Sequence, residues 1–291
     1  MVGRTSKLWL AYLVGQGAAI VALHFIPRNT LPHAIWQSAI GVASAAFAVV
    51  GVRRFRPRGA RVWYLLGTGL FLNALGMTVE GLDLSDKRPQ LADAFWMALY
   101  PFLFAGLGTL VYWRIRGEDR GMMVLNTAAS VVSTLFVGIF AWQLLIWQTP
   151  WDRPSLAARA TVIAYPIFDL MVIPLVLRLF LTGARVPSVA LLAGGHCAQL
   201  AGDLAWASFT RTGAHPTGVQ QHLIETISMI GFALLGAAAL HPSIREAVPG
   251  PRAGDPRRVD WTALALSLLM PPAVLLVQVL LDLLFSALLG G

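Results

Sequence analysis

Apolar residues in this sequence are gathered into long blocks instead of alternating with charged residues. Each block is about 20 residues long, the length of a helix that crosses the hydrocarbon core of a bilayer. The blocks lie at about 8–26, 33–52, 62–82, 91–113, 121–147, 159–182, 187–209, 219–240 and 261–289. The pattern predicts an all-α protein, in which residues 1–291 form a single integral membrane domain, a polytopic transmembrane bundle of about nine helices.

The composition agrees with this prediction and excludes two broad classes. The chain is 57% hydrophobic and only 12% charged, whereas soluble domains carry about 25% charged residues. A soluble globular enzyme and a disordered chain are therefore excluded. A net charge of +8 would suggest nucleic acid as a partner in a soluble protein. In a membrane protein such a charge arises from arginines in the loops between helices. We therefore expect the lipid bilayer as the partner and no nucleic acid.

Basic residues indicate the direction of the helices. With the N-terminus in the cytoplasm and nine alternating helices, 16 of the 22 Lys and Arg residues fall inside and 6 outside. Such a bias sets topology, so the N-terminus is predicted to be cytoplasmic. Two arginine-rich loops, Arg53–Arg61 and Arg114–Arg120, are also expected to meet a cytoplasmic signalling partner or anionic lipid. A homodimer is left open.

Polar side chains recur inside the apolar blocks at spacings of three, four or seven residues, which keep them on one helix face. An ionisable side chain at bilayer depth costs at least ~2.5–3.5 kcal/mol on insertion scales and therefore indicates a site. The candidate ligand-binding residues are Glu80, Asp93, Tyr100, Tyr165, Asp169, His196, Gln199, Asp203, His222 and Glu225.

Their depths favour a pocket that opens to the outside. The predicted topology places Asp169 and His196 near the middle of the membrane, and the inner half has almost no acidic residue. The outer third receives Glu80, Asp93, Asp203, His222 and Glu225. Carboxylates gathered at one depth repel each other unless a cation, a proton or a histidine lies between them. We therefore expect one outward-facing polar pocket for a small external ligand or cation.

Three alternatives remain open for these residues. Each polar side chain could serve only as an interhelical hydrogen bond, worth ~0.6 kcal/mol on average. His222 with Glu225 could bind a metal ion, and His24 with His222 could ligate haem, although the spacing supports neither strongly. No metal site is predicted and the cofactor is unknown.

Catalytic motifs are missing from the sequence. No HxxxD-like, HExxH or GxSxG phrase occurs, and the longest polar stretch, His241–Asp260, is too short for a soluble domain. The chain is therefore not expected to be an enzyme. Any activity is expected to belong to the bundle itself or to something attached to it.

Four phrases carry a resemblance to a known family. They are ADAFWMALYPFLFAGL at 92–107, AYPIFDLMVIPLVLRLFL at 164–181, GDLAWA at 202–207 and ALHPSIRE at 239–246. They resemble the N-terminal multi-spanning region of actinobacterial cyclic-di-GMP signalling proteins, in which it precedes cytoplasmic GGDEF and EAL domains. The matching positions are Asp93, Tyr100, Pro101, Tyr165, Pro166, Asp169, Arg178, Asp203, His241, Pro242 and Arg245. This chain contains no GGDEF or EAL motif.

The resemblance implies a function and a location. The family's membrane region is a sensor, so the expected function is a sensory or regulatory module of a bacterial signalling protein, multi-pass in the plasma membrane. The alternative is a transporter or permease subunit for a small solute or ion. Prolines inside predicted helices, at Pro101, Pro166 and Pro174, together with Asp169 near the midplane, would suit a transporter.

Overall fold

The computed structural model describes residues 7–82, 90–115, 120–141, 156–183, 185–211 and 218–249. In these residues it contains eight α-helices, one 3₁₀ helix and no strand. They are α2 (Leu8–Leu23), α3 (Leu31–Phe55), α4 (Ala60–Leu82), α5 (Leu91–Ile115), α6 (Arg120–Ala141), α7 (Leu156–Gly183), α8 (Pro187–Arg211), α9 (Gly218–Leu240) and η2 (Pro242–Glu246). The all-α prediction and its first eight helices are confirmed, and the ninth predicted segment, 261–289, lies outside the described residues.

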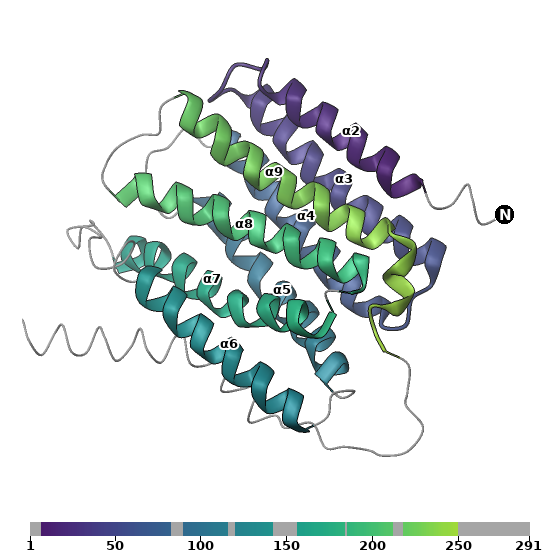
Figure 1. The fold of residues 1–291 in the computed structure, drawn as a ribbon. Coiled ribbons are helices and arrows are strands. Elements are labelled where there is room, and N and C mark those ends of the chain that lie inside the picture. Colours follow the sequence, from purple (N-terminus) through teal and green to yellow (C-terminus); the bar gives the residue numbers. More distant parts are fainter. Residues whose placement is uncertain are drawn as a thin grey trace, which may run out of the picture.

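The helices pack as two rows (Figure 1). One row is α3, α4 and α5, and the other is α9, α8 and α7. α2 packs against α9 and α3 at one side of the bundle, and α6 packs against α7 at the other. Because successive helices run in opposite directions, the ends of α3, α5 and α9 meet the starts of α4 and α8. We call this the basic end, since it carries the arginines from Arg53 to Arg61 and also Arg114, Arg185 and Arg245.

Four helices among the described residues are long and apolar enough to cross a membrane: α3, α4, α5 and α9. Large apolar side chains on the outside of the bundle agree with a lipid surrounding. Val14 is 73% exposed, Phe25 83% and Val124 64%, whereas soluble proteins rarely expose such side chains over wide areas. These findings indicate a membrane protein.

The ends of α3 are set by local sequence. Thr30 adopts an extended conformation, and its hydroxyl accepts a hydrogen bond from the backbone N–H of His33. Pro32 lies in the first turn, where its missing N–H costs no helical hydrogen bond. At the other end Arg56 takes the left-handed conformation, with φ +46°, and its N–H bonds to the carbonyl of Val52. This residue stops the helix before Pro57.

Small residues bring the rows together. The second half of α9 is a run of buried glycine and alanine, from Gly236 to Ala239, which lets α3 and α8 approach closely. Gly51 on α3 lies against the carbonyl of Ala239. Trp63 on α4 and Phe232 on α9 are almost completely buried. The half of the bundle near the basic end is therefore a dense apolar core.

The short helix η2 completes the basic end. The sequence treats His241–Asp260 only as a polar loop, but Ile244 and Ala247 are fully buried. The backbone N–H of Ser188, at the start of α8, donates to Oγ of Ser243 at 2.9 Å. This segment therefore belongs to the bundle.

Candidate functional site

Two tyrosine–aspartate pairs cross between α5 and α7. The hydroxyl of Tyr100 on α5 donates to Oδ1 of Asp169 on α7 at 2.7 Å. The hydroxyl of Tyr165 on α7 donates to Oδ1 of Asp93 on α5 at 2.8 Å. Each helix thus supplies one donor and one acceptor. We call these four residues the Tyr–Asp network, which the sequence spacing places on single helix faces and the fold brings together.

Asp93 also has a structural role in this network. Its Oδ2 accepts a hydrogen bond of 2.7 Å from the backbone N–H of Gln90, the residue that precedes the helix. An acidic residue at the third helical position commonly provides a partner for this N–H group. Asp93 is 3% exposed and uses both carboxylate oxygens in hydrogen bonds. It therefore anchors the start of α5.

Asp169 differs from Asp93 because its described hydrogen bond uses only one oxygen. It is 8% exposed, and Asp203 on α8 lies close enough to interact with it electrostatically, as it also does with Tyr100. Asp203 is itself exposed. Within the part of the chain that the structure describes, neither carboxyl group forms an ion pair. The two acidic groups therefore form a pair that lacks a basic counter-charge there.

A second polar group lies where α2, α3 and α9 meet, at the end of the bundle opposite the basic end. Nδ1 of His24 and Nδ1 of His222 are 2.7 Å apart, and Nε2 of His24 lies 2.9 Å from Oγ1 of Thr226. Oε2 of Glu225 lies 3.7 Å from Nε of Arg28 and 3.6 Å from Nε2 of His33. We call these six residues the histidine cluster.

The contacts of this cluster hold the ends of three helices together. Arg28 also donates to the carbonyl of Gly218 at 2.8 Å, so the α2–α3 connection is bonded to the start of α9 at several points. The rings of His24 and His222 touch at a centroid distance of 4.5 Å, which leaves no space for a haem plane between them. No group of three or more His, Cys, Asp or Glu among the described residues has the arrangement of a metal site.

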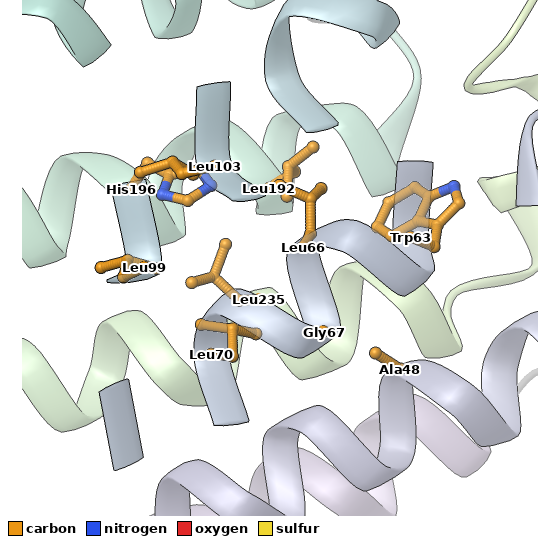
Figure 2. A pocket seen from close by; sticks show the side chains of 10 residues that line it. All are labelled: Ala48, Trp63, Leu66, Gly67, Leu70, Leu99, Leu103, Leu192, His196 and Leu235. Atoms are coloured by element: carbon orange, nitrogen blue, oxygen red, sulfur yellow. The ribbon is translucent and has the colours of Figure 1, made fainter. Parts of the chain in front are cut away.

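His196 is separate from both groups. Its ring lies among leucines from α4, α5, α8 and α9, beside a cavity of about 10 Å³ (Figure 2). The side chain is 6% exposed, and among the described residues its Nε2 has no hydrogen-bond partner. Such a cavity has at most the space of a single water, and a water needs two or more polar partners. We therefore assign His196 to the core rather than to a ligand pocket.

Two other candidates are also outside the Tyr–Asp network. Nε2 of Gln199 on α8 donates to the carbonyl of Ser228 on α9 at 3.1 Å, which is a packing contact between these helices. Glu80 is exposed near the end of α4, where Gly81 packs against Ala34.

The structure distributes these candidate residues over two separate groups. The structure places Asp93, Tyr100, Tyr165, Asp169 and Asp203 on α5, α7 and α8, and it places His222 and Glu225 on the far side of α9, against α2 and α3. Spacing along one helix gives the face of a residue but not the helix that packs on that face.

Sequence reasoning also missed several partners. Arg28 lies in a loop and His33 lies at the start of a helix. Polar residues are common at such positions, so the sequence does not indicate a site there. Thr127 was not singled out, yet its Oγ1 accepts from the buried guanidinium of Arg178, which also donates to the carbonyl of Met123 at 3.3 Å. Arg178, one of the family-matching positions, thereby connects α7 to α6.

Comparison with known proteins identifies no relative. No protein-family model, curated protein or solved structure matches this chain.

Proposed function

We propose that this chain is a sensory or regulatory module, multi-pass in a bacterial plasma membrane with a cytoplasmic N-terminus, and that it binds a small cation between Asp169 and Asp203. The observation that carries the proposal is this acidic pair, one carboxyl buried and one exposed, with no ion pair in the described residues. A cation between the groups would relieve their repulsion.

The Tyr–Asp network connects such binding to helix position. Asp169 is bonded to Tyr100 on α5, and Asp93 ties α5 back to α7 through Tyr165. A cation at Asp169 would draw the carboxylate toward Asp203 on α8 and change its bond to α5. This response suits a sensor, since a sensor needs two helix arrangements with different ligand affinity. The resemblance to the membrane region of cyclic-di-GMP signalling proteins supports the same role.

A transporter is the second candidate, and one observation favours it. Pro101 lies inside α5 directly after Tyr100, so the helix lacks one backbone hydrogen bond beside the network. The dense core between the network and the basic end speaks against a passage through the bundle. Flux of Na⁺ or K⁺ into liposomes that contain the purified protein would favour transport over sensing.

Thermal unfolding of the full chain in detergent tests the proposed site. Melting temperatures are compared in NaCl, KCl and choline chloride at equal ionic strength. A cation at ten times its Kd stabilises the folded state by about 1.4 kcal/mol, which corresponds to a shift of about 3 °C or more. We expect Asp169→Asn and Asp203→Asn to abolish the shift.

The matched control is Glu246→Gln, which removes one carboxylate from the exposed surface of the basic end. It should keep the shift. Equal melting temperatures in all three salts for the wild-type chain, or an unchanged shift in both Asp variants, would contradict cation binding at this pair.

A further inference from the structure

A cleft of about 440 Å³ opens at the basic end of the bundle. It lies where the end of α3, the turn into α4 and the segment around η2 meet. Three arginines line it, Arg56, Arg58 and Arg245, together with the apolar side chains of Phe55 and Val248. The cleft thus combines cationic and apolar walls.

Arg245 is held in place by its neighbours. Its Nε donates to the carbonyl of Phe55 at 2.9 Å, and the guanidinium carbon lies 5.6 Å from the centre of the Phe55 ring. These contacts fix the plane of the guanidinium and leave its two terminal amino groups outside the hydrogen bond. A fixed guanidinium that keeps two parallel donors is suited to the oxygens of a phosphate.

Arg56 lines the same cleft from a backbone conformation that side chains rarely adopt. Its φ is +46°, in the left-handed region, where glycine is the usual residue at a helix C-terminus. An arginine at this position keeps a charged side chain on the cleft wall that glycine would not supply. Uncommon backbone conformations of this kind are concentrated at binding sites.

The charges of the cleft are unbalanced. Among the described residues that line it, one is acidic, Glu246, and three are arginines. In the described residues none of the three arginines forms an ion pair with a carboxylate. Their mutual repulsion would be relieved by an anion in the cleft.

We propose that this cleft binds the phosphate group of an anionic phospholipid. The cleft lies at the ends of α3 and α9, two of the helices that are long and apolar enough to cross a membrane, so it is at the level of lipid headgroups. Its apolar wall, from Phe55 and Val248, fits the glycerol and upper acyl chain next to the phosphate. Basic residues beside membrane helices are attracted to anionic lipids, each with an appreciable contribution. The proposal is independent of the acidic pair on α7 and α8.

The test counts bound lipid on the full chain. Protein in a neutral detergent is titrated with phosphatidylglycerol or phosphatidylcholine, and bound lipid is measured by native mass spectrometry. We expect tight binding of phosphatidylglycerol and about tenfold or greater loss of affinity in the double variant Arg56→Gln/Arg58→Gln. The matched control is Arg53→Gln/Arg54→Gln, which removes the same charge from exposed positions outside the cleft and should change affinity less than twofold.

Three results would overturn the proposal. The first is an equal loss in the cleft and control variants, which would mean that total charge, and not the cleft, attracts lipid. The second is equal binding of the two lipids. The third is complete displacement of the lipid by millimolar inorganic phosphate, which would assign the cleft to a soluble phosphate compound. The melting temperatures of the two double variants are also compared. Equal melting temperatures would show that a difference in lipid affinity does not come from a difference in folding.

Discussion

Tyr100 on α5 donates a hydrogen bond of 2.7 Å to Oδ1 of Asp169 on α7. Both side chains are buried, with exposed fractions of 5% and 8%, and the Tyr100 ring lies 4.9 Å from the Phe168 ring. A carboxylate in such surroundings depends on its donors, because losing one leaves a buried acceptor without its bond. This hydrogen bond therefore couples the position of α5 to the environment of the Asp169 carboxyl group.

Replacing Tyr100 by Phe is expected to destabilise the folded protein by about 1–2 kcal/mol, because it removes the donor and keeps the ring. The measurement is equilibrium unfolding in mixed micelles. In a double-mutant cycle with Asp169→Ala, the two changes should be non-additive by at least about 0.5 kcal/mol, since each removes one partner of the same hydrogen bond.

The matched control for this cycle is Tyr64→Phe. Tyr64 is 41% exposed on α4, so the loss of its hydroxyl should have little effect on stability. Strict additivity of Tyr100→Phe and Asp169→Ala would show that the hydrogen bond does not contribute.

Gly51 on α3 lies directly against the backbone of α9. A Cβ atom at this position would overlap the backbone carbonyl of Ala239 and lie 2.6 Å from its carbon, and backbone cannot move aside as a side chain can. Gly51→Ala is therefore expected to destabilise the protein by about 1–3 kcal/mol, measured by thermal unfolding.

Gly17→Ala is the control for this change. A Cβ at Gly17 on α2 would meet no atom within 4 Å, so alanine there should leave stability unchanged or raise it by up to about 1 kcal/mol through helix propensity. Similar losses in both variants would show that the α3–α9 contact is looser than the structure has it.

The helices could be predicted from the sequence because apolar length is a strong signal. The predicted segment 62–82 corresponds to Ala60–Leu82, and 219–240 to Gly218–Leu240. The first helix ends earlier than predicted, at Leu23 instead of residue 26, because Pro27 follows closely and disfavours helix before it. The short helix at Pro242–Glu246 was missed because its polar composition resembles a loop.

The site was only partly predictable, for a physical reason. Spacings of seven on α5 and four on α7 correctly place Asp93 with Tyr100, and Tyr165 with Asp169, on shared faces. They do not say that these two faces meet, nor that Glu225 faces α2 and α3 instead. Helix order in a bundle depends on the packing of small residues across long sequence separations, which no single segment encodes.

Arg114 ties together three parts of the basic end. Its Nη1 donates to the carbonyl of Ala247 at 2.6 Å, and its Nη2 donates to the carbonyl of Thr182 at 2.7 Å. Arg114→Lys should lose at least one of these bonds, since an ammonium cannot span both carbonyls, and should destabilise the segment by about 1.5–3 kcal/mol. Faster amide hydrogen exchange in residues 243–248 would report this loss. The control is Arg54→Lys at an exposed position, which should leave the exchange rates unchanged. Unchanged exchange rates in Arg114→Lys would show that its two hydrogen bonds do not stabilise this segment.

His241 caps the helix η2 through its ring. Its Nδ1 accepts from the backbone N–H of Ser243 at 3.1 Å, so this nitrogen must be free of a proton for the cap to form. Burial lowers the pKa of His241 below its ordinary value of 6.5, and the nearby Glu246 opposes this only in part. Trp9, whose ring centre lies 5.1 Å away, contributes to the burial.

The basic end should therefore lose stability in acid. Below pH 6.5 the unfolded chain takes up a proton at His241 while the folded chain does not, so the contribution present at higher pH falls as the pH is lowered through the folded-state pKa. Melting temperatures of wild type and His241→Asn, measured from pH 8 to about 5, test this, because asparagine caps a helix without titrating in that range. We expect the two curves to differ by a constant amount above about pH 7 and the wild-type curve to fall more steeply below it. Parallel curves over the whole range would show that His241 is not the group that titrates.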